Sequence, residues 1–276
     1  MNTTPPDASQ AALWNGHAGR AWVDTKAALD QMFQPLEDRL VDAVSARHAR
    51  RVLDVGCGTG STTLAIAHKL GTRSDCLGAD ISEPMIAVAR RHETPSARFI
   101  VADAQTHAFE PASFDMIVSR LGVMFFDDPV AAFTNLRRAA SPGAALWFVA
   151  WRNASDNPFM TTAERAAAPL LPNLPPREPG APGQFAFADR DRVTAILSAS
   201  GWTDIDIQPL DVECTLPERE LVPYLSRLGP VGRALQDEDA PTRARVVDVM
   251  RTAFDGYVHG HEVRFTAACW VVSARA

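Results

Sequence analysis

Several features that mark particular protein classes are missing from this sequence. There is no run of basic residues and the net charge is −6, which disfavours a nucleic-acid substrate. The longest uninterrupted apolar run, residues 144–151, is far shorter than the roughly 20 residues that cross a membrane. Residues 1–10 are polar and contain Pro5 and Pro6, so they predict a tail and not a signal peptide. We therefore expect a cytoplasmic protein that binds neither nucleic acid nor a membrane.

Cysteine is also scarce and widely spaced. Because none of the four cysteines forms a C-x-x-C pair, the sequence indicates neither a zinc site nor a disulfide framework. A chain of 276 residues with 46% hydrophobic residues can nevertheless bury one α/β core and carry an additional layer. We expect one domain with a cap, and no metal site.

The most informative stretch is residues 51–70, RVLDVGCGTGSTTLAIAHKL. It predicts a buried strand over Arg51–Val55, a glycine-rich turn over Gly56–Gly60, and then a helix. Alternate glycines permit positive φ and let a ligand approach the main chain, while the helix start offers free N–H donors. Ser61 stands where the third glycine of G-x-G-x-x-G would be, which argues against a dinucleotide. The turn therefore predicts a ligand site of another kind.

Acidic residues follow the next two predicted strands. Residues 75–80 end at Asp80, and residues 98–102 end beside Asp103. Taken singly, each would more often be a surface acid at a strand end. Acids at the carboxyl ends of successive parallel strands, however, lie at the crevice where open α/β sheets bind ligands. Asp80 could accept hydrogen bonds from both ribose hydroxyls of a nucleoside and Asp103 from an adenine amino group, so a nucleoside-bearing cofactor is predicted.

The remaining pattern predicts helices, further strands and two insertions. Ser82 is the expected N-cap of a helix that places Met85 beside the nucleoside pocket, although Met85 alone would more often be a core residue. Residues 1–48 are expected to form a tail and a helical stripe interrupted at Pro35. Within them, residues 14–22 form either a packed helical layer anchored by tryptophans or a lid over the cofactor. Further strands are expected at 114–119, 144–151, 202–210 and 262–274, with a proline-rich cap at about 152–188 and a helical insert at about 217–258.

As a whole, the pattern resembles the class I S-adenosylmethionine-dependent methyltransferases. The G-x-G-x-G turn is similar to their motif I, and nearly the whole chain looks like a bacterial small-molecule group related to the ubiquinone/menaquinone methyltransferases. The segments that carry this resemblance are Trp14–Gly16, Val52–Gly60, Ser119–Phe126, Trp151–Phe159 and Ala268–Ala274. The family's G-P-F appears here as Gly183-Gln184-Phe185, a departure that falls in the cap.

The resemblance has implications for fold and cofactor. It implies a Rossmann-like α/β fold with a seven-stranded, mostly parallel sheet, an antiparallel last strand, and helices on both faces beneath the lid and cap. It also implies S-adenosylmethionine as the cofactor, with S-adenosylhomocysteine as the product. The residues expected to bind it are Trp22, Asp54, Gly56, Cys57, Gly58, Gly60, Asp80, Ile81, Met85, Asp103, Ala104, Ser119 and Arg120.

Catalytic residues are less firmly indicated. A sulfonium methyl group is already activated, so a general base is needed only if the acceptor carries a proton and is a poor nucleophile. Among the candidates His17, His259 and His261 we favour His17, which lies in the predicted lid, although a lone histidine is more often structural.

Arg120, just after the fourth strand, could hold an acidic acceptor. Pairing with Asp127 or Asp128 is the alternative. Asn157-Pro158-Phe159 looks like the N/D-P-P-Y/F tetrapeptide of enzymes that methylate nitrogen, but it follows the wrong strand, so we expect the likeness to be coincidental.

Three functions stay open at this point. We favour a methyltransferase acting on O, N or C of a small metabolite. The others are a methyltransferase-fold sensor or partner subunit without transfer activity, and a nicotinamide-dependent oxidoreductase. The expected partners are a small-molecule methyl acceptor and, as an option, a second copy of the chain in a homodimer. The aromatic residues expected near the cap suggest an apolar or aromatic acceptor: Phe125, Phe126, Trp151, Phe159, Phe185 and Phe187.

Overall fold

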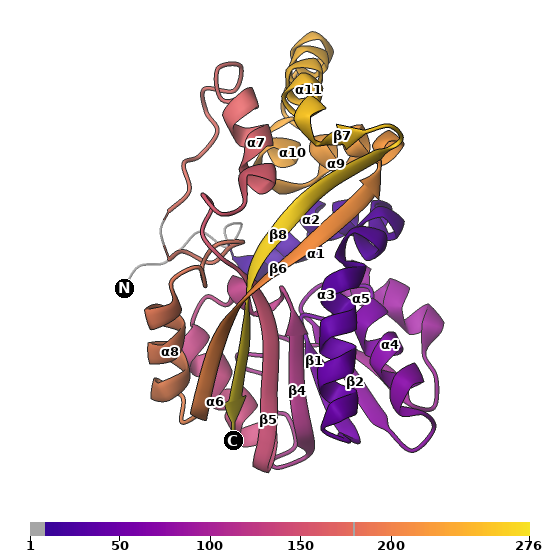
Figure 1. Cartoon of the computed structure of the whole chain (residues 1–276), viewed down its shortest axis with the longest axis vertical. Helices are drawn as coiled ribbons and strands as arrows, with labels where there is room; N and C mark the ends of the chain where they lie inside the picture. The colour runs from indigo at the N-terminus through magenta and orange to yellow at the C-terminus, as the bar shows by residue number, and fades with distance from the viewer. Residues whose placement is uncertain (1–8, 179) are drawn as a thin grey trace.

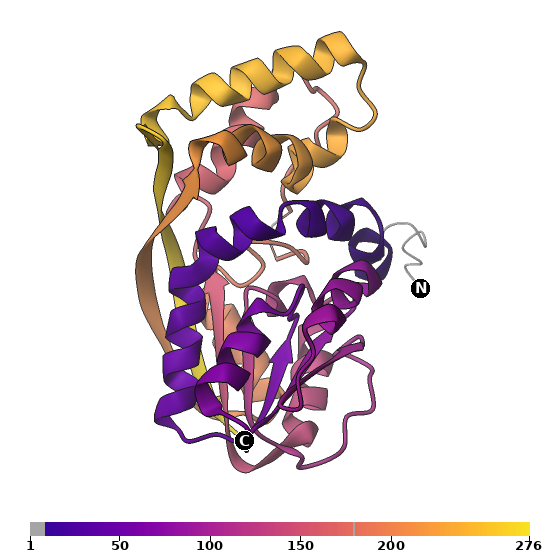
Figure 2. The ribbon, with the colours of Figure 1, turned by 90° about the vertical axis from the view of Figure 1, so that its right-hand side faces the viewer.

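The computed structural model describes residues 9–178 and 180–276, so most of the predicted N-terminal tail lies outside the described residues. Figure 1 shows a twisted sheet covered by helices on both faces, with a second group of helices beyond one end of the strands. In Figure 2 the indigo N-terminal helices lie between that group and the sheet. The molecule thus has three levels along its long axis: sheet, N-terminal helices and outer helices.

The sheet has the order β3-β2-β1-β4-β5-β8-β6, and the short β7 pairs with β8. Strands β1 to β5 run parallel to one another, while β8 runs antiparallel to both β5 and β6. The expected α/β class, seven principal strands and antiparallel last strand are therefore confirmed. The bounds are β1 Arg51–Val55, β2 Asp75–Asp80, β3 Ala97–Val101, β4 Phe114–Arg120, β5 Ala140–Trp151, β6 Thr203–Pro217, β7 Val258–His259 and β8 Glu262–Arg275.

Helices alternate with the parallel strands and are capped by side chains that the sequence supplies. Ser82, Asp128, Asp189 and Asp239 each accept a hydrogen bond from a backbone N–H in the first turn of α5, α6, α8 and α11. The bounds are α1 Gln10–Asn15, α2 His17–Asp24, α3 Lys26–Ala46, α4 Ser61–Leu70, α5 Glu83–Ala89, α6 Pro129–Ala139, α7 Pro158–Ala167, α8 Arg190–Ala199, α9 Leu221–Arg227, α10 Gly229–Ala234 and α11 Ala240–Ala253.

Two expectations about these elements are wrong. Pro35 does not interrupt the N-terminal stripe, because α3 runs through it as one helix. An internal proline costs about 3 kcal/mol, and here the fully buried Met32, Leu36 and Leu40 on the same face offset that cost. Strand β6 does not end at Leu210 but continues to Pro217, since its inward residues keep alternating and pair with β8.

The long strands β6 and β8 carry the outer helices. Strand β8 pairs with β5 only from Cys269 to Arg275, whereas its residues 262–268 pair with β6. This two-stranded part projects past the sheet, and residues 218–261 between the two strands contain α9, α10 and α11 (Figure 1). We call residues 218–261, which correspond to the predicted helical insert and not to the proline-rich segment at about 152–188, the cap insert.

Helix α7 is fastened to the same two-stranded part by Asn157 and Phe159. The buried Asn157 amide donates to the carbonyl of Ala268 at 2.9 Å and accepts from its N–H at 2.9 Å. Phe159 stacks on Phe265, with ring centroids 3.8 Å apart. Both residues serve packing, which agrees with the expectation that the tetrapeptide likeness is coincidental.

Candidate functional site

A cavity of about 1080 Å³ lies at the carboxyl ends of β1, β2 and β4. Its floor comes from these strand ends and from the turn after β3. Its roof comes from α1 and α2, the loop before α8, and helices α9 and α10. This is the crevice in which open α/β sheets bind ligands. The predicted cofactor residues on its surface are Trp22, Gly56, Gly58, Asp80, Ile81, Met85, Asp103, Ala104 and Arg120.

The glycine turn needs glycine for two different reasons. Gly56 has φ +66°, and a Cβ there would lie 2.7 Å from the Cα of Gly122. Gly58 has φ +56°, and a Cβ there would meet nothing nearer than Met85 Sδ at 3.7 Å. Because Gly58 lines the cavity, a ligand can approach its main chain in the space that a side chain would occupy. The turn therefore provides a cradle of the kind that a cofactor needs.

Asp80 sits beside this turn and is tied to the backbone on both sides. Its Oδ2 accepts from the N–H of Gly58 and its Oδ1 from that of Ser82, each at 2.8 Å. Burial raises the pKa of Asp80, while these backbone N–H groups oppose the rise. A carboxylate has about four lone-pair sites, so both oxygens can still accept a hydroxyl of a ligand.

Asp103 lies on the cavity floor after β3, the strand that pairs with β2. Its Oδ1 accepts from the N–H of Gln105 at 2.9 Å, which fixes the carboxylate in the turn. Burial and the nearby Asp103 charge raise the pKa of Asp127. Gln105 and Ala104 also line the cavity, and Gln105 was not anticipated from the sequence.

Four predicted cofactor residues do not line the cavity: Asp54, Cys57, Gly60 and Ser119. Asp54 is buried under the turn and accepts from Thr63 Oγ1 at 2.7 Å. Cys57 packs in a small apolar cluster with Phe99, and burial raises the pKa of its thiol. Ser119 Oγ accepts from the N–H of Gly122 at 3.2 Å. These contacts support the turn from below.

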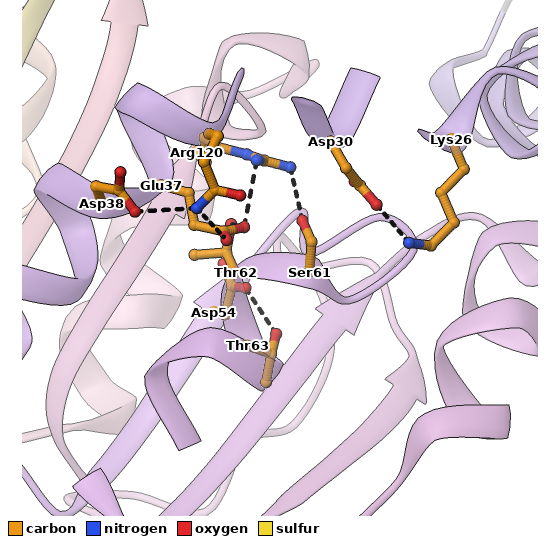
Figure 3. Close-up of polar contacts among 10 residues, drawn as sticks. Lys26, Asp30, Glu37, Asp38, Asp54, Ser61, Thr62, Thr63 and Arg120 are labelled. Atoms are coloured by element: carbon orange, nitrogen blue, oxygen red, sulfur yellow. Dashed lines mark hydrogen bonds and ion pairs between the residues drawn. The ribbon is translucent and has the colours of Figure 1, made fainter. Parts of the chain in front are cut away.

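Arg120 has a different partner from the one expected. Its Nη1 lies 3.4 Å from Glu37 Oε2 and its Nη2 donates to Ser61 Oγ at 3.0 Å, as Figure 3 shows. The alternative that the sequence left open, pairing with Asp127 or Asp128, is therefore wrong. Glu37 comes from α3, which packs across the ends of β4 and α4, and no local signal in the sequence connects residues so far apart. Both side chains are nearly buried, at 11% and 8% exposure.

Helices α1 and α2 are docked onto the turn that follows Asp80. Asn15 Nδ2 donates to the carbonyl of Ile81 at 3.0 Å, and its Oδ1 accepts from the N–H of Glu83 at 2.8 Å. Ser82 Oγ donates to the carbonyl of Trp14 at 2.7 Å. A Cβ at Gly19 would lie 2.0 Å from that same carbonyl, so the two helices can cross only with glycine there. We call residues 10–24 the N-terminal lid.

His17 lies in this lid and lines the cavity, whereas His259 and His261 do not. Its Nε2 is 3.1 Å from the carbonyl oxygen of Arg227 in α9. A carbonyl oxygen can only accept, so Nε2 carries the proton of that hydrogen bond. In the neutral ring Nδ1 is then the nitrogen with a free lone pair.

The roof of the cavity combines aromatic and basic side chains. Phe185 lines the roof, while Phe125, Phe126 and Trp151 line the cavity from the ends of β4 and β5, as expected. Phe159 and Phe187 are packed elsewhere. The roof also contains arginines that the sequence gave no means of grouping: Arg177, Arg192, Arg227 and Arg233.

Two negative findings apply to residues 9–178 and 180–276. Within them, no group of His, Cys, Asp and Glu side chains could hold a metal ion. No helix there is long and apolar enough to cross a membrane.

Comparisons with known proteins agree with this geometry. A family model described as a methyltransferase domain matches residues 53–148, which include the glycine turn, Asp80, Asp103 and Arg120. The chain is 28% identical over 180 residues to the demethylmenaquinone methyltransferase of Renibacterium salmoninarum, covering 62% of this chain and 74% of that protein. It is 33% identical over 122 residues to the aklanonic acid methyltransferase DauC of Streptomyces sp. strain C5, covering 43% and 56%. The fold is similar to that of the YcgJ protein from Bacillus subtilis, with a TM-score of 0.54 and 17% identity over 87% of this chain and 97% of that one.

Proposed function

We propose that this chain, a class I S-adenosylmethionine-dependent methyltransferase, methylates an O, N or C atom of a small metabolite with an apolar or aromatic body. The names of the relatives, which are methyltransferases, support transfer activity over a nicotinamide-dependent oxidoreductase or a cofactor-binding sensor. The names of the two relatives, which refer to demethylmenaquinone and aklanonic acid, support a small organic acceptor.

One observation carries the proposal: a single cavity joins two chemically different walls. The floor has acids at the strand ends, Asp80 and Asp103, beside the glycine turn. Large apolar side chains line the rest of the cavity, including Phe125 after β4, Trp151 at the end of β5 and Phe185 in the loop before α8. At about 1080 Å³ the cavity reaches the upper end of the roughly 300–1,000 Å³ usual for ligand sites, which leaves room for cofactor and acceptor together.

The cofactor side follows from the floor. S-adenosylmethionine supplies a methyl group already activated by the sulfonium, so the protein has chiefly to align the acceptor and exclude water. Asp80 would bind the ribose hydroxyls, and Asp103 with Ala104 would bind the adenine. The Gly56–Gly60 turn would let the cofactor approach the main chain. The N-terminal lid lines this side of the cavity with Trp14 and Trp22, whose rings meet edge to face.

The first experiment is a calorimetric titration with S-adenosylhomocysteine, followed by a methyl-transfer screen against phenols, amines, quinones and carboxylic acids. Binding followed by turnover on one class supports the proposal and identifies the atom methylated. Absence of binding, or turnover only on macromolecules, would contradict it.

Asp80→Ala tests the floor of the site directly. We expect S-adenosylhomocysteine affinity to fall by about 1.5–3 kcal/mol, roughly 10- to 150-fold, because charge-assisted hydrogen bonds are lost. Asp75→Ala is the matched control, since Asp75 lies at the other end of β2 in an exposed pair with Arg98. Asp80→Asn keeps the side-chain volume and should also weaken binding. Unchanged affinity in both Asp80 variants would contradict the assignment.

His17 is the proposed general base for acceptors that carry an ionisable O–H. With Nε2–H held by the Arg227 carbonyl, Nδ1 is the nitrogen that can take the proton. His17→Ala should lower kcat on such acceptors roughly 100-fold and leave S-adenosylhomocysteine affinity unchanged. His259→Ala, outside the cavity, should have no effect on kcat. An equal kcat for His17→Ala would exclude this role.

A further inference from the structure

The cavity is polarised, with acids on its floor and an excess of arginines on its roof. The floor contributes Asp80 and Asp103, while the roof contributes Arg177, Arg192, Arg227 and Arg233 against Glu178 and Asp189. The whole chain carries a net charge of −6, so a basic surface inside its cavity runs against the overall balance. Such a surface raises the local concentration of anions.

Two of these arginines already have partners. Arg177 donates to both carboxylate oxygens of Glu164, and its guanidinium lies 4.7 Å from the centre of the Phe185 ring. Arg192 donates to the carbonyl of Gly180 at 3.0 Å. Of the two roof acids, Asp189 caps α8 through two backbone N–H groups, and Glu178 pairs with none of the four arginines within the described residues.

Arg233 and Arg227 differ from them. In the part of the chain that the structure describes, neither guanidinium makes an ion pair or a hydrogen bond. Arg233 lines the cavity from α10, and its side chain is accessible there. Desolvation by the surrounding protein lowers its pKa, Arg177 acts in the same direction, and Glu164 opposes them. Arg233 and Arg227 are both exposed and stay charged at neutral pH, so their guanidinium N–H groups are free to bind a ligand in the cavity.

A ligand anion is the partner that this arrangement lacks. Glu164, the carboxylate whose charge raises the pKa of Arg233, is already bound to Arg177 by two hydrogen bonds. A guanidinium presents two parallel N–H groups that match the two oxygens of a planar carboxylate. The neighbouring roof surface is apolar, with Met160, Tyr224 and Leu228, which suits the body of an organic acid more than a free inorganic anion.

We propose that the methyl acceptor is an organic carboxylic acid whose carboxylate is anchored by Arg233, with Arg227 beside it, while its apolar or aromatic body extends toward the cofactor side of the cavity. This inference rests on the proposed function. Arg233 acts on binding of the acceptor and not on binding of the cofactor, because it belongs to the roof.

The test is calorimetry on the full chain saturated with S-adenosylhomocysteine, using 2-naphthoate and its neutral isostere 2-naphthamide as probes. We expect the wild type to bind the acid roughly 10- to 100-fold more tightly than the amide. Arg233→Ala should abolish this preference and leave S-adenosylhomocysteine affinity unchanged, and Arg233→Lys should restore it in part, because the charge returns without the fork. Arg245→Ala, an exposed arginine on α11 away from the cavity, is the matched control and should keep the preference.

The outcomes separate the two proposals. Equal binding of acid and amide by the wild type, no binding of either, or a preference that survives in Arg233→Ala would overturn the carboxylate anchor. Tighter binding of 2-naphthyl phosphate than of 2-naphthoate would overturn the acid class, and loss of S-adenosylhomocysteine affinity in Arg233→Ala would move the residue to the cofactor. If Arg233→Ala does not fold, the preference for the acid over the amide is compared instead between the wild type and the double variant Arg227→Ala/Arg233→Lys, which should weaken it. Failure of the wild type to bind S-adenosylhomocysteine would instead contradict the proposed function.

Discussion

At the scale of single residues, Asp54 is the most unusual group beneath the site. It is 1% exposed, and its Oδ1 has no hydrogen-bond partner among the described residues. Burial raises its pKa to about 7, while the hydrogen bond from Thr63 and the charge of Arg120 act in the opposite direction. An unfolded aspartate titrates near 3.9. Between about pH 4 and 7 the folded chain therefore holds a proton that the unfolded chain has lost, and the free energy of unfolding falls as pH rises through this window.

Asp54→Asn should remove much of this pH dependence. Asparagine has similar volume, can still accept from Thr63, and carries no charge to desolvate. We expect the free energy of unfolding to fall less between pH 4 and 8 than in the wild type, with a gain at pH 8 of at most about 4 kcal/mol. Denaturant unfolding at several pH values measures this, with the exposed Asp42→Asn as control. Parallel pH profiles for wild type and Asp54→Asn would rule out a raised pKa at Asp54.

The sequence predicts the position of a residue in the cavity where that position depends on residues close to it in the chain. Asp80 and Asp103 follow their strands directly, and the parallel sheet brings the strand ends together, so both could be placed in advance. Glu37 and Gln105 could not, because each acquires its role from a segment that only the tertiary fold brings near. Cys57 and Ser119 lie within the motif but face away from the cavity, which spacing alone cannot reveal.

At the scale of elements, the N-terminal lid is held by few contacts. Asn15 supplies two hydrogen bonds to the turn after β2, at Ile81 and Glu83, and Ser82 supplies a third to Trp14. Helices α1 and α2 are short, and α1 has no buried residue. Elements with few buried contacts open at low free-energy cost.

Asn15→Ala should therefore loosen the lid without unfolding the sheet. Loss of two hydrogen bonds is expected to cost about 1–3 kcal/mol of local stability. Hydrogen exchange should become roughly 10- to 100-fold faster in residues 10–24, while the amides of β1 and β4 keep their protection. Gln31→Ala, on the exposed side of α3, is the control. If exchange in residues 10–24 is unchanged, Asn15 does not hold the lid.

The ends of helices were predictable only where a capping residue marks them in the sequence. Ser82 caps α5 as predicted, because a cap is local chemistry, and Asp128 and Asp189 cap α6 and α8 in the same way. Pro35 failed as a stop because buried packing along α3 outweighed it. Within the predicted helical insert, α9 and α10 are separate helices, and α10 begins at Gly229, whose φ is +71°.

At the scale of the whole molecule, the sheet was predictable and the roof of the cavity was not. Strand periodicity and the glycine turn depend on neighbours in sequence, and they suffice for the α/β class and the cofactor floor. The roof joins the lid, the loop before α8 and the cap insert, and its arginines range from Arg177 to Arg233. These segments meet because β6 and β8 project past the sheet. The alternation of apolar and polar residues in one strand does not predict how far that projection extends.

The cap insert leaves and re-enters the sheet at two residues that are paired with each other, Pro217 and Glu262. Between those two points the chain can lengthen, shorten or be exchanged without shifting the register of any strand that holds the glycine turn. On our proposal that the roof selects the acceptor, the acceptor can change with the cap insert while the residues of the glycine turn stay the same. A lineage can diversify its acceptors by recombination at this one junction, and a protein engineer can graft there for the same reason.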